Sequence, residues 1–104
     1  MHRKDLLTDA IALTTGDRNA AYGPPYENLS DCAGLFTTYV IGKYRGQEID
    51  EKKFALTAED VAHFNVLQKM ARSYRGDVPR PDTYIDMAAY SAIAGECAAE
   101  ESKE

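Results

Sequence analysis

Two carboxylates near the start of this 104-residue sequence have the type and spacing of cation ligands. Glu27 and Asp31 lie one turn apart in a segment with helical periodicity, and Gly34 and Thr38 fall on the same side of that helix. Small residues beside two carboxylates leave space for a hydrated cation, and two oxygen ligands suit Mg²⁺, which usually keeps several waters. A solvated outer face would have the same pattern, and the sequence leaves both interpretations open.

A second pair of carboxylates lies near the C-terminus, on a helix that is apolar almost all round. Asp86 falls among Ala89, Tyr90 and Ile93, and a carboxylate in such surroundings must be paired, hydrogen-bonded or metal-bound. Asp82 lies one turn earlier on the same side. It is either a second ligand or an acidic residue at the start of the helix, where the positive end of the helix dipole favours a carboxylate. Asp86 is the residue least explained by folding alone.

Basic and amide side chains form a stripe on the preceding helix. Asn65, Lys69 and Arg72 recur at helical spacing, opposite a broad apolar face. The stripe either faces solvent or is the internal partner of Asp82 and Asp86. In the second case Lys69 and Arg72 neutralise carboxylates, contact phosphates, or both.

An early loop adds Arg18, Tyr22 and Gly23. Gly23 permits a backbone turn that other residues resist, and Tyr22 offers a flat ring for stacking. Such a loop would cover a nucleotide base or phosphate, or it is only a connector with a buried tyrosine.

Four helices are expected to position these residues. They are predicted over about 3–15, 26–44, 57–76 and 81–99, the third opening on a capping box from Thr57 to Asp60. The segment 45–55 is charged and irregular and could carry a short extended piece. The fold predicted is an all-α, small antiparallel four-helix bundle, one domain over 1–104 with 1–2 and 100–104 frayed. A chain of this size often pairs with copies of itself, so a homo-oligomer is expected.

Each of the two central helices has an apolar face expected to form the core. On the second helix the face consists of Leu29, Cys32, Ala33, Phe36, Tyr39 and Val40. On the third it consists of Phe64, Leu67, Ala71 and Tyr74, together with Ala62, Val66 and Met70. His63 lies near the centre of the second set, where a satisfied core histidine is expected rather than a base or a ligand.

Composition excludes several classes of function. A net charge of −5, with 12 basic against 17 acidic residues, argues against general nucleic-acid binding but not against one free nucleotide. No apolar run is long enough to span a membrane, and the N-terminus does not resemble a signal peptide. Cys32 and Cys97 lack metal-finger spacing and are expected to be reduced, mostly buried thiols in the cytoplasm of the host cell.

The order and spacing of these residues resemble a family of short bacteriophage and prophage proteins of unassigned function, over roughly residues 8–98. The resemblance rests on the following motifs: Gly16-Asp17-Arg18, Tyr22-Gly23-Pro24, Glu27-Asn28, Glu59-Asp60-Val61, Lys69 with Arg72, and Asp82 with Asp86 and Tyr90. Those proteins are in turn similar to the all-α nucleoside triphosphate pyrophosphohydrolases of the MazG and dimeric dUTPase type. The shared pattern is acids on one helix, a lysine, and acids on a later helix.

This second resemblance implies a Mg²⁺-dependent enzyme that cleaves a nucleoside triphosphate to a monophosphate and pyrophosphate. The implied metal ligands are Glu27, Asp31, Asp82 and Asp86, and the implied catalytic residues are Lys69 and Asp86. The residues expected to contact the substrate are Arg18, Tyr22, Asn65, Lys69, Arg72 and Tyr90. The sequence departs from the Glu-x-x-Glu signature: Ser30 stands where the second acid would be, and both acidic pairs are spaced by four. These departures favour nucleotide binding over catalysis.

Three functional hypotheses follow from the sequence. The first is a nucleotide pyrophosphohydrolase acting on a phage nucleotide pool. The second is a non-catalytic phage protein that sequesters a nucleotide signal or inhibits a host defence protein. The third is a structural oligomer whose charges form internal salt bridges.

Overall fold

The structure, a computed structural model, describes residues 1–16 and 24–103, and most of this part of the chain is helical. The helices are α1 (Arg3–Thr15), α3 (Pro25–Lys43), α4 (Glu51–Phe54), α5 (Ala58–Ser73) and α6 (Pro81–Glu101). No strand occurs among the described residues, which confirms the all-α class. Four of the five helices match the four predicted segments to within three residues at each end.

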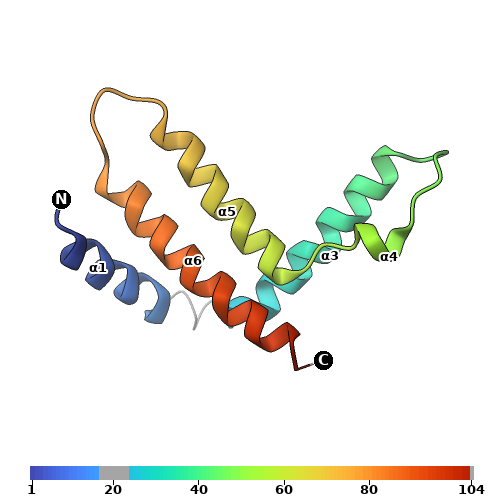
Figure 1. Ribbon diagram of the computed structural model, residues 1–104, viewed down its shortest axis with the longest axis horizontal. Helices are drawn as coiled ribbons and strands as arrows, with labels where there is room; N and C mark the ends of the chain where they lie inside the picture. The colour runs from blue at the N-terminus through green and yellow to red at the C-terminus, as the bar shows by residue number, and fades with distance from the viewer. Residues whose placement is uncertain (17–23, 104) are drawn as a thin grey trace.

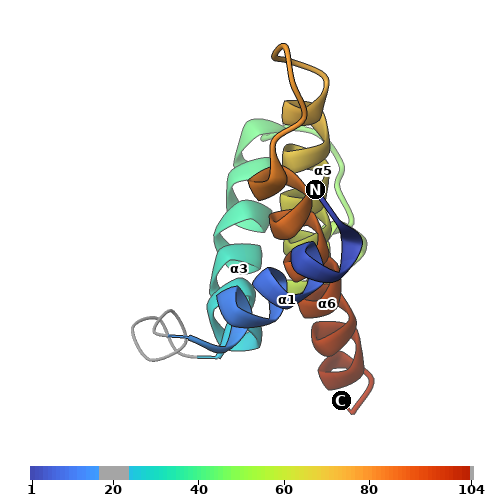
Figure 2. The same cartoon turned by 90° about the vertical axis from the view of Figure 1, so that its left-hand side faces the viewer.

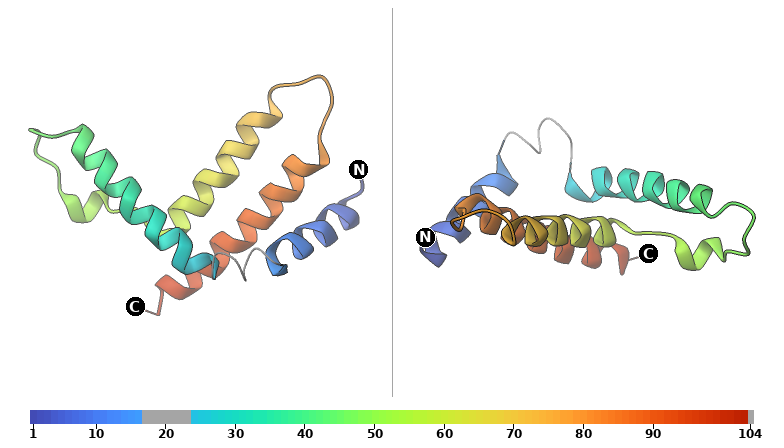
Figure 3. Two further views of the ribbon diagram at one scale, coloured as in Figure 1. Left: turned by 180° about the vertical axis from the view of Figure 1, so that it is seen from behind. Right: turned by 90° about the horizontal axis from the view of Figure 1, so that it is seen from above.

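The helices are arranged as a V (Figure 1). One arm is the antiparallel pair α5 and α6, with α1 packed on the other side of α6. The other arm is the second half of α3, with the short α4 beside it. Viewed from above, α3 lies in a separate layer from α5 and α6 and projects beyond them (Figure 3). Figure 2 shows α1 and α3 on different sides of the α5/α6 pair. The extents of the molecule are 49 × 34 × 23 Å.

The vertex of the V contains the core, which is small. Among the described residues the buried hydrophobic side chains are Ala10, Leu29, Ala33, Ala58, Val61, Ala62, Ala89, Ala94 and Cys97. Seven of these nine, all but Ala10 and Ala89, form the cluster at the vertex. Four of the seven are alanines, so the helices approach closely there but bury little apolar surface per residue. The first half of α3 packs there through Leu29 and Ala33.

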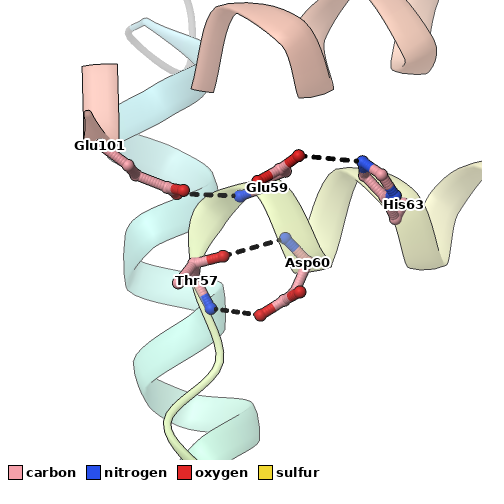
Figure 4. Close-up of polar contacts among 5 residues, drawn as sticks. All are labelled: Thr57, Glu59, Asp60, His63 and Glu101. Atoms are coloured by element: carbon pink, nitrogen blue, oxygen red, sulfur yellow. Dashed lines mark hydrogen bonds and ion pairs between the residues drawn. The ribbon is translucent and has the colours of Figure 1, made fainter. Parts of the chain in front are cut away.

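Hydrogen bonds at the start of α5 hold the vertex together (Figure 4). The Asp60 N–H donates to Thr57 Oγ1 at 3.2 Å, and the Thr57 N–H donates to Asp60 Oδ2 at 2.9 Å, so the predicted capping box is present. The Glu59 N–H donates to Glu101 Oε1 at 3.0 Å, which ties the start of α5 to the end of α6. The helix therefore continues to Glu101, and the predicted fraying from residue 100 is wrong for Glu100 and Glu101.

The irregular segment contains a helical turn and not an extended piece. Asp50 caps α4 by accepting hydrogen bonds from the N–H groups of Lys52 and Lys53, at 3.1 and 3.4 Å. The Leu56 N–H then donates to Thr37 Oγ1 at 2.9 Å, which fastens the chain back onto α3 before α5 begins.

The face of α5 that packs on α6 is not the one expected. Val61 and Ala62 are buried and Lys69 is half-buried, whereas Phe64 and Leu67 are exposed. The prediction of a core histidine is also wrong, because the His63 side chain is 57% exposed and lies 3.4 Å from Glu59 Oε2. The physical reason is the partner: α6 presents Asp86 to α5, so Lys69 of the polar stripe faces inward, whereas Arg72 of the same stripe is exposed.

The second half of α3 also leaves its apolar residues uncovered in this chain. Phe36 and Tyr39 are exposed, although they continue the stripe that begins with Leu29 and Ala33. None of the described helices is long and apolar enough to cross a membrane.

Candidate functional site

An ion pair joins the two long helices near the open end of their seam. Lys69 Nζ on α5 lies 3.0 Å from Asp86 Oδ2 on α6, and the two side chains are only 16% and 26% exposed. Of the two interpretations of the polar stripe, the structure therefore supports the internal one for Lys69. A carboxylate and an ammonium group this far from solvent stabilise one another mainly by preventing an unpaired buried charge.

The ion pair forms part of the wall of a pocket of about 540 Å³ at the end of the α5/α6 pair. The pocket is bounded by the last turn of α5, the connecting loop and the first turns of α6. Its charged lining residues are Lys69, Arg72, Arg75, Arg80, Asp82 and Asp86. Four cations against two carboxylates give this surface a formal charge of +2 in a chain whose net charge is −5. One third of the 12 basic residues are gathered here.

The backbone at the start of α6 adds to this positive surface. Pro81 is the first helical residue, and no side chain of Arg80 caps the helix. Pro81 has no N–H group and the Thr83 N–H donates to the Arg80 carbonyl oxygen at 3.2 Å, so the start of α6 contributes mainly the positive end of the helix dipole, which favours an anion. Tyr84, which is 39% exposed, also lines the pocket and places an aromatic ring beside it.

The predicted site residues are divided among several places. Arg72 and Asp82 line the pocket with Lys69 and Asp86. Asn65 and Tyr90 are half-buried, one turn from Lys69 and Asp86 respectively, and do not line it. Arg18 and Tyr22, with Gly23, lie outside the described residues.

The first acidic pair is not near the second within one chain. Glu27 and Asp31 are exposed on the half of α3 that packs on Ala94 and Cys97. At 1.5 Å per residue, Ala94 lies about 12 Å along α6 from Asp86. The described residues contain no group of three or more His, Cys, Asp or Glu side chains that could hold a metal ion. The four-carboxylate site implied by the resemblance is thus not assembled by the described part of one chain.

Sequence reasoning missed eight of the twelve residues that line the pocket, among them the two cations Arg75 and Arg80. A signal for them exists in the sequence, because Lys69, Arg72, Arg75 and Arg80 are four cations within twelve residues, on both sides of a helix break. A hairpin of two helices brings the two sides of such a break together.

The opposite end of the same helix pair is acidic. Glu59, Glu96 and Glu101 surround Cys97, whose side chain is fully buried. Burial raises the pKa of the Cys97 thiol, and the charges of Glu101, Glu96 and Glu59 raise it further. A thiol in this environment stays neutral and is a poor nucleophile at neutral pH.

The fold and the pocket together define a small all-α protein with one anion-attracting end. The chain belongs to the family described as Domain of unknown function (DUF6378), which matches residues 5–98. It is similar to the Gene 55 protein of Mycobacterium phage D29, with 35% identity over 88 residues. The match covers 85% of this chain and 50% of the phage protein, so the chain spans about half the length of that relative. No solved structure matches the chain.

These findings confirm the first step of the resemblance and not the second. A family of unknown function and a phage relative agree with the expected phage proteins of unassigned function. The likeness to MazG-type pyrophosphohydrolases is not shown by them and remains part of the proposal below.

Proposed function

We propose that this protein binds a nucleotide through its phosphate groups, in the pocket at the open end of α5 and α6. The observation that carries this proposal is the gathering of Lys69, Arg72, Arg75 and Arg80 around one concave site in an acidic protein. A surface that tracked a nucleic-acid backbone would need an extended basic stripe. A single cluster of four cations and two carboxylates, with a formal charge of +2, suits the phosphate chain of one nucleotide.

The size and lining of the pocket fit a nucleotide. A volume of about 540 Å³ lies within the range of pockets that hold drug-sized ligands. The arginines offer planar pairs of donors to phosphate oxygens, and the start of α6 offers the positive end of its dipole. Tyr84 provides a ring against which a base stacks. Asp86 holds Lys69 in place, so that its ammonium group is already oriented when the ligand arrives.

Hydrolysis is the further step that the resemblance suggests. In that reaction water attacks the α-phosphorus, the bond to the bridging oxygen breaks, and pyrophosphate leaves with the electron pair of that bond. Lys69 and Arg72 would neutralise the negative charge on the phosphates. Mg²⁺ would enter with the phosphates and be held on the protein by Asp82 and Asp86, since Mg²⁺ is commonly bound by one or two carboxylates plus substrate phosphates. This step is supported by the resemblance to MazG-type enzymes, in which acids on one helix, a lysine, and acids on a later helix follow in the same order as in this chain.

The binding proposal is tested by isothermal titration of the full chain with ATP, GTP, CTP and dUTP, each compared with its nucleoside. We expect binding of one or more triphosphates and none of the nucleosides. Arg75→Ala and Arg80→Ala should each weaken binding about tenfold or more, the value of one hydrogen bond to a charged group. Lys52→Ala, which removes an exposed cation of α4 outside the pocket, is the matched control and should bind as the native chain does. Equal binding by all variants would refute the proposal.

Catalysis is tested separately by pyrophosphate release in the presence of Mg²⁺. Release that is lost in Asp86→Asn, while the variant still binds nucleotide, would support the hydrolase. If the native chain releases no more pyrophosphate than a control with chelated metal, the enzyme hypothesis is refuted and the binding proposal stands.

One observation favours the second hypothesis, a non-catalytic binder that sequesters a nucleotide signal or inhibits a host defence protein. The described residues contain no group of three or more His, Cys, Asp or Glu side chains that could hold a metal ion, and Asp86, one of the two carboxylates at the pocket, is already paired with Lys69. A nucleotide recovered intact after long incubation with the protein and Mg²⁺ would distinguish this binder from the enzyme.

A further inference from the structure

An unpaired apolar surface lies on both arms of the V. On α5 it consists of Phe64 and Leu67, which are 44% and 56% exposed. On α3 it consists of Leu35, Phe36 and Tyr39, which are 71%, 44% and 71% exposed. Monomeric proteins rarely expose so many large apolar side chains on adjacent elements, and such a patch marks an interaction site.

Helix geometry places the two halves of this surface on either side of the angle between α5 and α3. Phe64 and Leu67 are about half a turn away from Ala62 and Lys69, which face α6. In Figure 1, α5 lies between α6 and the opening of the V, so its outer face is turned toward that opening. Phe36 lies on the side of α3 that, one and two turns earlier, packs into the core at the vertex.

The whole chain exposes more surface than a compact monomer. Its accessible area is 7867 Å², whereas a single folded chain of 11.5 kDa exposes about 5,800 Å². Its radius of gyration is 15.8 Å, against about 13 Å for a compact domain of this length. The excess is roughly 2,000 Å² per chain. When two chains each bury that much, the total falls in the range of permanent dimer interfaces, about 2,000–5,000 Å².

We propose that a second copy of the chain covers this surface in a two-fold symmetric dimer. Residues 35–43, the second half of α3, lie in the opening of the partner's V and pack on the outer face of the partner subunit's α5. Both complementary halves are present on every chain, as an isologous interface requires. Two copies of α3 and two of α5 then enclose a shared core, as a four-helix bundle between chains and not the one within a single chain that the sequence predicts.

Charge distinguishes a second copy from a membrane as the occupant. No charged residue occurs from Cys32 to Gly42 of α3. A helix that lies on a lipid surface carries lysine and arginine on its polar face, and this one carries none there. The net charge of −5 also disfavours an anionic membrane.

The alanine-rich core adds a reason for a permanent partner, since one chain alone buries few large apolar side chains.

Sedimentation equilibrium of the full chain measures this directly. We expect a mass of about 23 kDa, twice that of the 11.5 kDa chain, and a melting temperature that rises with protein concentration. Phe36→Lys and Leu67→Glu should each halve the mass or lower the melting temperature steeply. Leu7→Glu, at a leucine of α1 that is 56% exposed but lies outside this surface, should leave the mass unchanged.

A mixing experiment keeps the proposal testable if either variant folds poorly alone. In a mixed dimer of Phe36→Lys with Leu67→Glu, one interface pairs the two new charges and the other is native. Mixing should therefore restore dimer mass and helical content that neither variant has by itself. A native chain that is a folded monomer at micromolar concentration, or that binds lipid vesicles as a monomer, would overturn the proposal. So would a dimer broken by Leu7→Glu and not by Phe36→Lys.

Discussion

The two ends of the α5/α6 pair use the same helices for different purposes. At the vertex, Ala62 and Cys97 are buried, the helices are in close contact, and hydrogen bonds fix the start of α5 to the end of α6. At the open end the contact is made by Lys69 and Asp86, and beyond them the helices border a pocket lined with arginine.

The difference shows how a small domain places the residues that stabilise the fold at one end of a helix pair and the residues available for binding at the other. Small apolar side chains allow close packing, which specifies how α3, α5 and α6 meet. Charged side chains cannot be packed in that way without partners, so they hold the helices apart and leave donors for a ligand. We therefore expect substitutions at the vertex to act on folding and substitutions at the open end to act mainly on binding.

The largest effect is expected from a charge introduced at the vertex. Ala62 is fully buried where α5 meets its neighbours, so Ala62→Glu would bury a carboxylate without a partner. The loss should be about 3 kcal/mol or more, a large part of the stability of a domain this size. Urea denaturation followed by circular dichroism measures it. Ala92→Glu, the same change at an exposed alanine of α6, should stay within about 0.5 kcal/mol of the native chain. If both variants are equally stable, the vertex is not the core.

The next effect is expected from breaking the ion pair at the open end. Asp86→Ala leaves the Lys69 ammonium group largely buried and unpaired, at a cost of about 1–2 kcal/mol because some solvent still reaches it. Replacing both residues, in Lys69→Met with Asp86→Leu, should recover most of that loss while abolishing phosphate binding. Urea denaturation and nucleotide titration of the native chain, Asp86→Ala and the double variant test this. If the double variant is less stable than Asp86→Ala, the Lys69–Asp86 pair contributes more to the free energy of unfolding than the mutual compensation of two buried charges.

A smaller effect is expected at the capping box. Thr57→Ala removes the acceptor for the Asp60 N–H and should cost about 1 kcal/mol, whereas Thr57→Ser keeps the hydroxyl and should cost less. Nucleotide affinity should not change in either variant, because the cap lies at the opposite end of α5 from the pocket. A change in affinity without a change in stability would mean that the two ends are coupled.

Sequence reasoning located the helices well and the packing face of α5 poorly. Caps, prolines and periodicity are local, so Thr57, Asp60 and Pro81 indicated where helices begin. Which face lies inside depends on the neighbour. Phe64 and Leu67 resemble a core face, but α6 offers a carboxylate to α5, and Lys69 faces inward to meet it.

The candidate site was predicted in part for the same reason. Asp86 stood out because its neighbours on the helix are apolar, and Lys69 was a natural partner for it. Arg75 and Arg80 were missed because they lie where the chain turns, and periodicity carries no information about which loop residues face a pocket. Glu27 and Asp31 share a helix face, which sets their distance from each other but not from Asp82 and Asp86.

The smallest effect concerns the acidic surroundings of Cys97 and is visible only at alkaline pH. The pKa of the Cys97 thiol is raised above its ordinary value of 9.0 by burial and by the charges of Glu101, Glu96 and Glu59. Between that value and the higher pKa of the folded state, the unfolded chain holds fewer protons at this group than the folded chain does. Stability should therefore be unaffected by this thiol at neutral pH and should fall as the pH rises through that window.

Urea midpoints at pH 7, 9 and 10 measure this fall. Tyrosines and lysines titrate in the same range, so the informative quantity is the difference between variants. Cys97→Ala should flatten the decline above pH 9, whereas Cys32→Ala, at the half-buried second cysteine, should decline as the native chain does. Identical declines in the two variants would show that neither burial nor the neighbouring carboxylates raise the pKa of the Cys97 thiol, and that the vertex does not shield this group as the structure indicates.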